Sequence, residues 1–145
     1  MIFKSFVDSN IWIYALLEVE ANLTKKEKVK TFLEELKSKS RIMVSVQVLN
    51  EFHWVLKRKY KIKETIIRQK VLNDILALCD VIPLDLQTYK KAYRVRDKYN
   101  ISSYWDSLLV ASALNSDCDI FYSEDKDMKH NLEIENKLVI RNPLL

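Results

Sequence analysis

The chain of 145 residues contains no glycine. Average usage near 7% would place about 10 glycines in a chain of this length. Their absence excludes the phosphate-binding loop G-x-x-x-x-G-K-[ST], the dinucleotide-binding turn G-x-G-x-x-G and the nucleophile elbow G-x-S-x-G, because each needs glycine at fixed positions. Any enzymatic function must therefore rest on side chains rather than on a glycine-lined backbone cradle.

Proline and cysteine are scarce as well. Pro83 and Pro143 are the only prolines, and a chain so poor in residues for tight hairpins disfavours a β-sandwich or a β-barrel. The two cysteines, Cys79 and Cys118, lack the spacing of a zinc site, and two are too few for a disulfide scaffold. We expect both to be buried free thiols in a protein of the reducing cytoplasm.

Long apolar runs are missing too. The sequence holds no stretch of about 18 apolar residues, so no membrane span is expected. The apolar start of the chain is interrupted at Asp8, which is too early for a signal peptide. A length of 145 residues is typical of one domain, and we expect residues 1–145 to form a single domain with one core.

Short apolar stretches alternate with amphipathic ones along the chain. The apolar stretches predict strands at residues 2–7, 41–45, 81–84, 119–122 and 137–141. The amphipathic stretches predict helices near residues 10–20, 24–36, 46–60, 64–79, 86–99 and 103–115. This alternation predicts an α/β domain with a short parallel sheet covered by helices.

Polar residues mark both ends of these helices. The expected N-caps are Asp8 or Ser9, Thr24, Ser45, Asp85, and Ser102 or Ser103. Helix ends that would usually take glycine in the left-handed conformation must use asparagine, for which the candidates are Asn22, Asn100 and Asn115.

Charge is unevenly distributed around a net value of +4. Residues 57–70 carry seven basic residues against one acid, and residues 90–98 carry five against one. Residues 117–136 reverse the sign, with seven acids against two lysines. Solvated helix faces explain such runs in most proteins, and charge alone favours that explanation here. The alternative is a polyanion held by basic flanks near an acidic centre.

Four acidic residues fall at junctions between expected strands and helices: Asp8, Glu51, Asp106 and Asp125. In parallel α/β sheets such junctions gather at one edge, where sites form. Converging carboxylates raise one another's pKa, a cost that Mg²⁺ or Mn²⁺ relieves. A metal ion held there can bind a phosphate oxygen and activate water, which is the chemistry of phosphodiester hydrolysis.

Each acid also has a purely structural explanation. Asp8 can cap the helix after it, and Asp106 follows Ser103 at the spacing of a capping box. Glu51 can be an exposed helix residue, and Asp125 an ordinary turn residue. Taken singly, none of the four stands out, so the surrounding sequence must decide.

Four segments provide that context in order: Phe6–Ile11 with Asp8-Ser9-Asn10, Ser45–Phe52 with Asn50-Glu51, Tyr104–Ala113 with Trp105-Asp106, and Asp119–Asp125 with Ser123-Glu124-Asp125. With the closing Ile140–Pro143, they resemble the PIN-domain ribonucleases and, within that family, the VapC-type toxins of toxin–antitoxin operons. The resemblance extends over nearly the whole chain.

The resemblance implies a three-layer α/β/α PIN-like domain with a short central parallel sheet and a metal-dependent endoribonuclease site. The family's acidic quartet, which holds one or two Mg²⁺ or Mn²⁺ ions, matches Asp8, Glu51, Asp106 and Asp125. Ser9 and Asn10 match polar positions that orient the first carboxylate. Toxins of this kind are usually homodimers, inhibited by a small antitoxin whose tail enters the active-site groove.

The segment after Asp125 departs from the family. Relatives with Ser-Glu-Asp often continue through a glycine-containing stretch, whereas here residues 126–131 read Lys-Asp-Met-Lys-His-Asn. Asp127 and Glu124 are therefore alternatives to Asp125, which stays the first choice. We interpret His130 as an incidental surface residue and His53 as a packed or partly satisfied histidine.

Three further interpretations concern aromatic and basic residues. Trp12, Trp54 and Trp105 lie close in sequence to the proposed ligands, and we interpret them as core or dimer contacts rather than as stacking surfaces for RNA bases. The basic runs would flank the site, and the candidate phosphate contacts are Arg58, Lys59, Lys91 and Arg94.

The sequence thus favours a metal-dependent endoribonuclease acting in the cytoplasm, with RNA as substrate and a small antitoxin as partner. One alternative is a catalytically inert domain that binds nucleic acid or a partner protein. Another is a related phosphodiesterase acting on DNA or flapped structures, because the fold alone does not fix the substrate.

Overall fold

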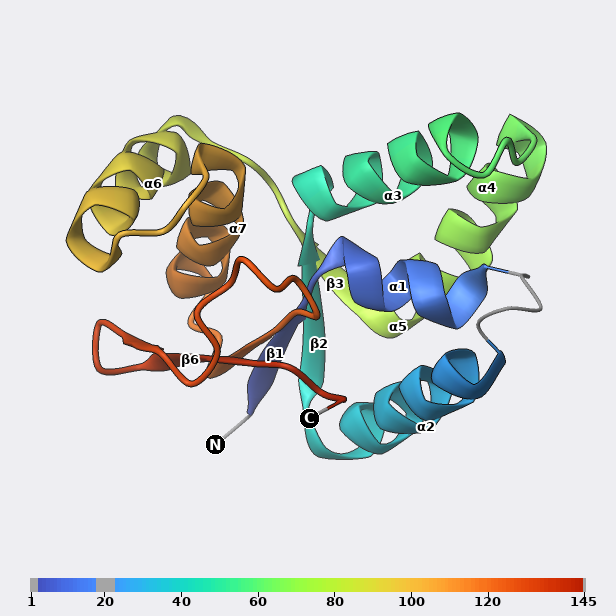
Figure 1. Cartoon of the computed structure of the whole chain (residues 1–145), viewed down its shortest axis with the longest axis horizontal. Coiled ribbons are helices and arrows are strands. Elements are labelled where there is room, and N and C mark those ends of the chain that lie inside the picture. The colour runs from blue at the N-terminus through green and yellow to red at the C-terminus, as the bar shows by residue number, and fades with distance from the viewer. Residues whose placement is uncertain (1–2, 18–22, 145) are drawn as a thin grey trace.

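The structure is a computed structural model, and it describes residues 3–17 and 23–144. A sheet of short strands lies at its centre in the order β3-β2-β1-β4-β6-β5 (Figure 1). The strands that pair in parallel are β1 (Lys4–Val7), β2 (Arg41–Ser45), β3 (Cys79–Ile82), β4 (Ile120–Tyr122) and β6 (Leu138–Arg141). The last edge strand, β5 (Glu133–Ile134), is antiparallel to β6.

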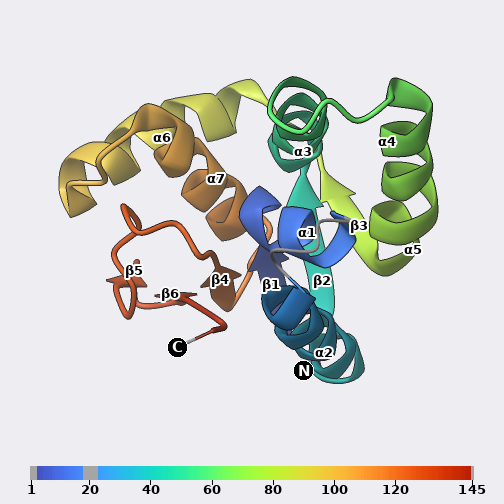
Figure 2. The ribbon, with the colours of Figure 1, turned by 45° about the vertical axis from the view of Figure 1, so that its right-hand side comes forward.

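Helices cover both faces of this sheet. α6 (Leu86–Tyr99) and α7 (Tyr104–Asn115) lie on one side of β1 and β2, and α1 (Ser9–Leu16) and α2 (Leu23–Lys39) lie on the other (Figure 2). α3 (Val46–Arg58) packs against α1 and leads through α4 (Glu64–Lys70), the π-helical turn η2 (Val71–Ile75) and α5 (Leu76–Leu78) to β3. The expected three-layer α/β/α arrangement is confirmed.

β1 is the strand at which the winding of the sheet reverses. The chain adds β2 and then β3 on one side of β1, and later returns to place β4 on the other side. In parallel α/β sheets, ligands bind in the crevice at the carboxyl end of such a strand. Asp8 is the first residue after β1 and therefore stands in that crevice.

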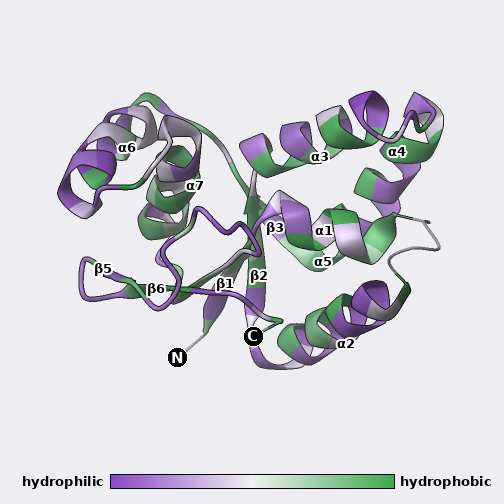
Figure 3. Cartoon of the chain, viewed as in Figure 1, coloured by the Kyte–Doolittle hydropathy of each residue, from purple (hydrophilic) through white to green (hydrophobic). Residues whose placement is uncertain are grey.

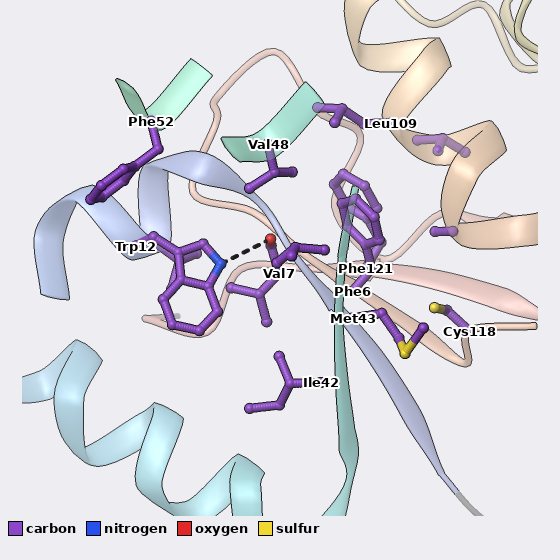
Figure 4. Close-up of a cluster of buried hydrophobic side chains, with 14 of the residues drawn as sticks. Phe6, Val7, Trp12, Ile42, Met43, Val48, Phe52, Leu109, Cys118 and Phe121 are labelled. Carbon is purple, nitrogen blue, oxygen red and sulfur yellow. Dashed lines mark hydrogen bonds between the residues drawn. The ribbon is translucent and has the colours of Figure 1, made fainter. Parts of the chain in front are cut away.

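The core beneath the crevice joins the strands to α1 (Figure 4). Phe6 of β1 stacks on Phe121 of β4, with ring centroids 5.0 Å apart. Trp12 is 1% exposed, and its Nε1 donates a hydrogen bond of 3.2 Å to the carbonyl oxygen of Val7. These contacts fix α1 on the end of β1, so Asp8 is held between two packed elements.

α7 is apolar nearly all round because it lies between the sheet and α6. Its residues 107–114 are all buried, and Figure 3 shows this hydrophobic helix beside the more hydrophilic α6. Ala92 and Ala111 form a small cluster with Leu108, where short side chains let the two helices approach closely. The first turn, which carries Asp106, emerges at the same edge of the sheet as Asp8.

Over residues 3–17 and 23–144, no helix combines the length and apolar character that crossing a membrane requires.

Helix starts agree with expectation where a side chain caps them. Asp8, Ser45, Asp85 and Ser103 each accept a hydrogen bond from a backbone N–H of the first turn. Thr24, by contrast, lies inside α2, so the expected capping role is wrong. N-caps are local contacts, and this explains why most of them could be predicted.

Two differences concern the region before β3. The single helix expected at 64–79 is divided into α4, η2 and α5, because the π-helical turn adds a residue that apolar periodicity does not reveal. β3 begins at Cys79 rather than Val81, so Cys79 is only half-buried, whereas Cys118 is fully buried. Burial raises the pKa of both thiols to about 12, as expected for unreactive cysteines.

Several non-glycine residues take the left-handed conformation. Asn100 ends α6 with φ of 54°, which confirms its predicted role. Asn115 is still helical, and Asp117 instead takes the left-handed conformation, with φ of 59°. Asn22 lies outside the described residues. Polar side chains therefore occupy positions where other proteins commonly place glycine.

Candidate active site

Asp8 stands at the carboxyl end of β1 and caps α1. Its Oδ1 accepts the N–H of Ser9 at 2.7 Å. The residue is 4% exposed, which is rare for an aspartate. Burial, and then the negative charges of Glu51 and Asp106, raises the pKa of Asp8 to about 7. Helix capping explains the position of Asp8, but it does not explain its burial beside two other acids.

Ser9 links the first carboxylate to the second. Its Oγ donates a hydrogen bond of 3.0 Å to Oε2 of Glu51 and lies 3.4 Å from Oδ1 of Asp8. Gln47, one helical turn before Glu51, donates from Nε2 to Oε1 of Glu51 at 2.9 Å and to the carbonyl oxygen of Trp105 at 3.1 Å. Both oxygens of Glu51 are therefore oriented, and α3 is tied to the start of α7.

Ser123, the first residue after β4, was not anticipated as part of the site. Its Oγ donates to Oδ2 of Asp8 at 2.8 Å and accepts the N–H of Asp125 at 3.1 Å. Asn10 donates from Nδ2 to the same hydroxyl at 3.1 Å and accepts the N–H of Glu124 at 3.1 Å. Asn10 thus acts on Asp8 through Ser123. The sequence signals for Ser123 are its place between a strand and an acidic turn and the Ser-Glu-Asp segment shared with the family, neither of which identifies its contact with Asp8.

Asp106 lies in the first turn of α7, where Ser103 accepts its N–H at 3.1 Å. Burial, and then the charges of Asp125, Glu51 and Asp127, raise the pKa of Asp106 above its ordinary value. Asp106 is therefore close enough to acids from two other elements to feel their charge. The structure brings all four expected acids into one electrostatic cluster at the carboxyl edge of the sheet.

The turn after β4 distinguishes the three candidates for the fourth acid. The carboxylate of Glu124 is turned away and forms an ion pair with Lys25 of α2. Asp127 donates its N–H to Oδ1 of Asp125 at 2.9 Å, which orients that carboxylate. These contacts favour Asp125 as the fourth ligand, with Asp127 as a nearby second acid.

The donor atoms of this cluster suit a hard cation. The four acids offer carboxylate oxygens, which Mg²⁺ and Mn²⁺ prefer. Among residues 3–17 and 23–144, no three His, Cys, Asp or Glu side chains are already drawn into the geometry of a single metal site. Burial, and then mutual repulsion, raises the pKa of Asp8 and Asp106, and a cation bound between the carboxylates would offset both effects. The residues present therefore fit a divalent metal ion.

The two histidines lie outside the carboxylate cluster. His130 places Nε2 3.1 Å from the carbonyl oxygen of Asp125, so it supports the turn rather than standing free on the surface as expected. His53 is only partly buried and lies 3.9 Å from Glu64. Neither contact makes these residues acid–base groups.

The three tryptophans have different surroundings. Trp12 belongs to the core, as Figure 4 shows. Trp54 and Trp105 are 61% and 65% exposed, so a role in the core is wrong for these two. Together with Val46 and Leu84 they line a hollow of about 610 Å³, which has Glu51 in its wall. Large exposed aromatic side chains beside a site mark a contact surface.

The four candidate phosphate contacts lie at the end of α3 and along α6. Arg58 lies at the end of α3, with its guanidinium 5.8 Å from the ring of Trp54, and Lys59 follows it. Arg94 is exposed on α6. Lys91 donates to Oδ1 of Asn115 at 2.9 Å. Since Asn115 ends α7 about 13 Å along the helix from Asp106, Lys91 is the least well placed of the four.

One known protein family matches most of the chain. The family model described as "PIN domain" matches residues 5–131. No curated protein sequence matches the chain.

Several solved structures share the fold. VapBC2 from Rickettsia felis, bound to a DNA fragment from its promoter, has a TM-score of 0.71 at 19% identity, covering 97% of this chain and 98% of that chain. VapC20 from Mycobacterium tuberculosis, described as a sarcin–ricin loop cleaving toxin, has a TM-score of 0.63 at 19% identity, covering 85% and 91%. FitAcB from Neisseria gonorrhoeae has a TM-score of 0.66 at 15% identity, covering 97% and 98%.

Proposed function

The chain belongs to the PIN-domain family, and we propose that it is a metal-dependent endoribonuclease that hydrolyses RNA phosphodiester bonds. The observation that carries this proposal is the convergence of Asp8, Glu51 and Asp106, in which burial and then the neighbouring charges raise the pKa of Asp8 to about 7. A domain that only binds RNA gains nothing from carboxylates directed at a polyanion, because like charges repel. Such a cluster is expected where a cation binds.

The ligands of Mg²⁺ or Mn²⁺ would be Asp8, Glu51, Asp106 and Asp125. When bound, the ion supplies positive charge to a phosphate oxygen and lowers the pKa of the attacking water. The protein contributes orientation: Ser9 holds Oε2 of Glu51, and Ser123 holds Oδ2 of Asp8. Both carboxylates are therefore oriented before substrate binds, so the reaction does not have to supply the conformational entropy of ordering them.

We also propose that the protein is the toxin of a toxin–antitoxin pair, with a small cognate antitoxin as partner and the cytoplasm as its location. The support is the shared fold with VapBC2, VapC20 and FitAcB over most of each chain. Two thiols kept unreactive by burial agree with a reducing compartment.

A homodimer is the expected assembly. Trp54, Trp105, Val46, Leu84 and Leu86 are exposed apolar residues on neighbouring elements, and the first four line the same hollow. A surface of this kind, left open to water, is costly, and covering it with a second copy would bury both tryptophans. The position of Glu51 in the wall of the hollow would bring the dimer contact next to the site.

RNA would be held by basic residues flanking the acidic cluster. Arg58, Lys59 and Arg94 are exposed and have the charge for phosphate contacts, whereas Lys91 is engaged by Asn115. We retain all four as proposed contacts and rank Lys91 last.

A cleavage assay tests the proposed reaction. Purified protein is incubated with structured RNAs in Mg²⁺, in Mn²⁺ and in EDTA, beside Asp8→Asn and Asp106→Asn. We expect metal-dependent internal cleavage by the wild type and none by either variant. Asp74→Asn, on η2 beyond α1, is the matched control and should cleave normally.

The same assay separates the alternatives. Cleavage that persists in EDTA or in both active-site variants would contradict metal catalysis. Tight RNA binding without cleavage would identify an inert binding domain. Preferential cleavage of DNA or of flapped duplexes, offered in parallel, would identify a related phosphodiesterase.

A further inference from the structure

We propose that Lys25 and Glu124 are positioning residues, whose ion pair holds the turn after β4 so that Ser123 and Asp125 face the carboxylate cluster. This inference rests on the proposed function only for its effect on metal binding. The ordering of the turn is a property of the metal-free protein.

Glu124 lies between the two residues that serve the site, and its side chain points the other way. Its N–H donates to Oδ1 of Asn10 at 3.1 Å, on the site side of the turn. Its carboxylate forms an ion pair with the Nζ of Lys25 on α2. The side chain of Glu124 is 18% exposed and that of Lys25 31% exposed, so the pair is mostly shielded from water. An ion pair in such surroundings is screened less than one on the open surface.

Lys25 sits at a place that helix physics disfavours. It lies in the first turn of α2, where the positive end of the helix dipole repels a cation. Its ammonium nitrogen is 3.7 Å from the centroid of the Tyr14 ring, so α1 contributes a cation–π contact. Tertiary contacts with Tyr14 and Glu124 offset the local cost. Through them, α1 and α2 both hold the turn.

The second carboxylate oxygen of Glu124 shows why the turn depends on this ion pair. Oε2 is buried and has no hydrogen-bond partner among the described residues. Lys25 is thus the side chain that compensates this carboxylate. Without it, a buried charge would be left unpaired, which is strongly unfavourable. The turn would then have to move outward so that Glu124 reaches water, and Ser123 and Asp125 would move with it.

This reasoning predicts an asymmetry among variants. Lys25→Met leaves an unpaired carboxylate and should disturb the site. Adding Glu124→Gln removes the charge that drives the movement, so the double variant should recover most of the wild-type behaviour. Lys98→Met is the matched control, because it breaks an ion pair with Glu135 whose two side chains are well exposed.

The experiment measures two quantities on each variant. Hydrogen exchange of the metal-free protein reports on the N–H groups of Asp125 and Asp127, and calorimetric titration with Mn²⁺ reports on metal affinity. For Lys25→Met we expect exchange of both groups to be faster by about tenfold or more, and the Kd for Mn²⁺ to rise about 10- to 100-fold. The double variant should return both values close to wild type, and Lys98→Met should change neither.

Opposite results would overturn the proposal. The first such result is that the Asp125 and Asp127 N–H groups exchange in Lys25→Met at the wild-type rate. The second is that the double variant is as impaired as Lys25→Met, which would mean that the single variant only loses packing. Failure of the proposed function gives a different pattern: the wild type cleaves no RNA, while the exchange rates still follow the predicted order. If the wild type binds no Mn²⁺, the exchange rates alone decide the positioning role.

Discussion

Ser123 donates a hydrogen bond of 2.8 Å to Oδ2 of Asp8, although the two residues are 115 positions apart in the chain. The same hydroxyl accepts the N–H of Asp125. One small side chain therefore couples the first acid of the cluster to the turn that carries the last, and its contacts suggest a direct test.

Replacing Ser123 with alanine should impair the site more than the fold. The variant leaves a buried carboxylate without one of its donors, which costs about 1–3 kcal/mol of stability, and it releases the turn. We expect cleavage and metal affinity to fall about 10- to 100-fold. Ser38→Ala, which removes an exposed hydroxyl bonded to its own helix, is the control and should leave both unchanged. Unaltered Mn²⁺ affinity in Ser123→Ala would contradict this role.

The pKa of Asp8 predicts how the stability of the metal-free protein depends on pH. The folded pKa of about 7 lies above the ordinary 3.8, so the folded state binds the additional proton between these values. Stability is therefore highest below pH 4 with respect to this group and falls as the pH rises through about 7. Shifts of this size correspond to about 4 kcal/mol.

Asp8→Asn removes this dependence because the amide does not titrate. In urea unfolding with EDTA present, we expect the variant to be more stable than wild type at pH 8 by a few kcal/mol, with the difference shrinking toward pH 5. Equal pH profiles for the two proteins would show that Asp8 keeps an ordinary pKa.

Metal addition should stabilise the wild type, and more at pH 8 than at pH 6, since Asp8 must lose its proton to bind a cation. With Mn²⁺ at about 100 times its Kd, the gain is about 2.7 kcal/mol, measured as a rise in Tm. Asp106→Asn should lose most of this rise, while Asp74→Asn keeps it. A rise of the same size in both variants would mean that the ion binds elsewhere.

The exposed tryptophans predict the effect of a charge on self-association. Trp54→Glu places a carboxylate in the hollow beside Trp105, so a dimer formed through this surface should dissociate. Sedimentation equilibrium measures the result. Leu72→Glu, at an exposed apolar residue of η2, should leave the assembly unchanged. A wild type that is monomeric at all concentrations would refute the homodimer.

Neutralising Arg58 and Lys59 together should weaken RNA binding and flatten its dependence on salt. Loss of two phosphate contacts lowers the slope of log K against log salt by about 1.4 for single strands. Lys91→Gln should change the slope less, because Asn115 already engages this side chain. Filter binding at several salt concentrations distinguishes these cases, and equal slopes for all variants would remove these residues from the interface.

The features that could be predicted from the sequence are those that depend on residues close together in the chain. Ser45 and Asp85 could be predicted as N-caps because each bonds to an N–H a few residues away. The four acids could be proposed because strand–helix junctions converge in a parallel sheet and because the segments around them resemble the PIN-domain ribonucleases. The alternation of strands and helices fixed the fold class for the same reason.

The contacts that complete the site could not be predicted in this way. Ser123 and Lys25 act on residues about a hundred positions away, and no local pattern reveals those contacts. The exposure of Trp105 could not be predicted from the sequence. Because α7 is apolar nearly all round, the spacing of its apolar residues does not identify a face that points to solvent. The π-helical turn η2 likewise follows from packing rather than from any breaker residue.

The place of β1 between β2 and β4 also governs when the site can exist during synthesis. Asp8 is made among the first residues, but the strand and turn that hold it, β4 and Ser123, emerge more than a hundred residues later. Contacts of such long range form late in folding. A nascent chain therefore carries the acids made so far as separate carboxylates, and it acquires the cluster only after nearly all of its length has been translated.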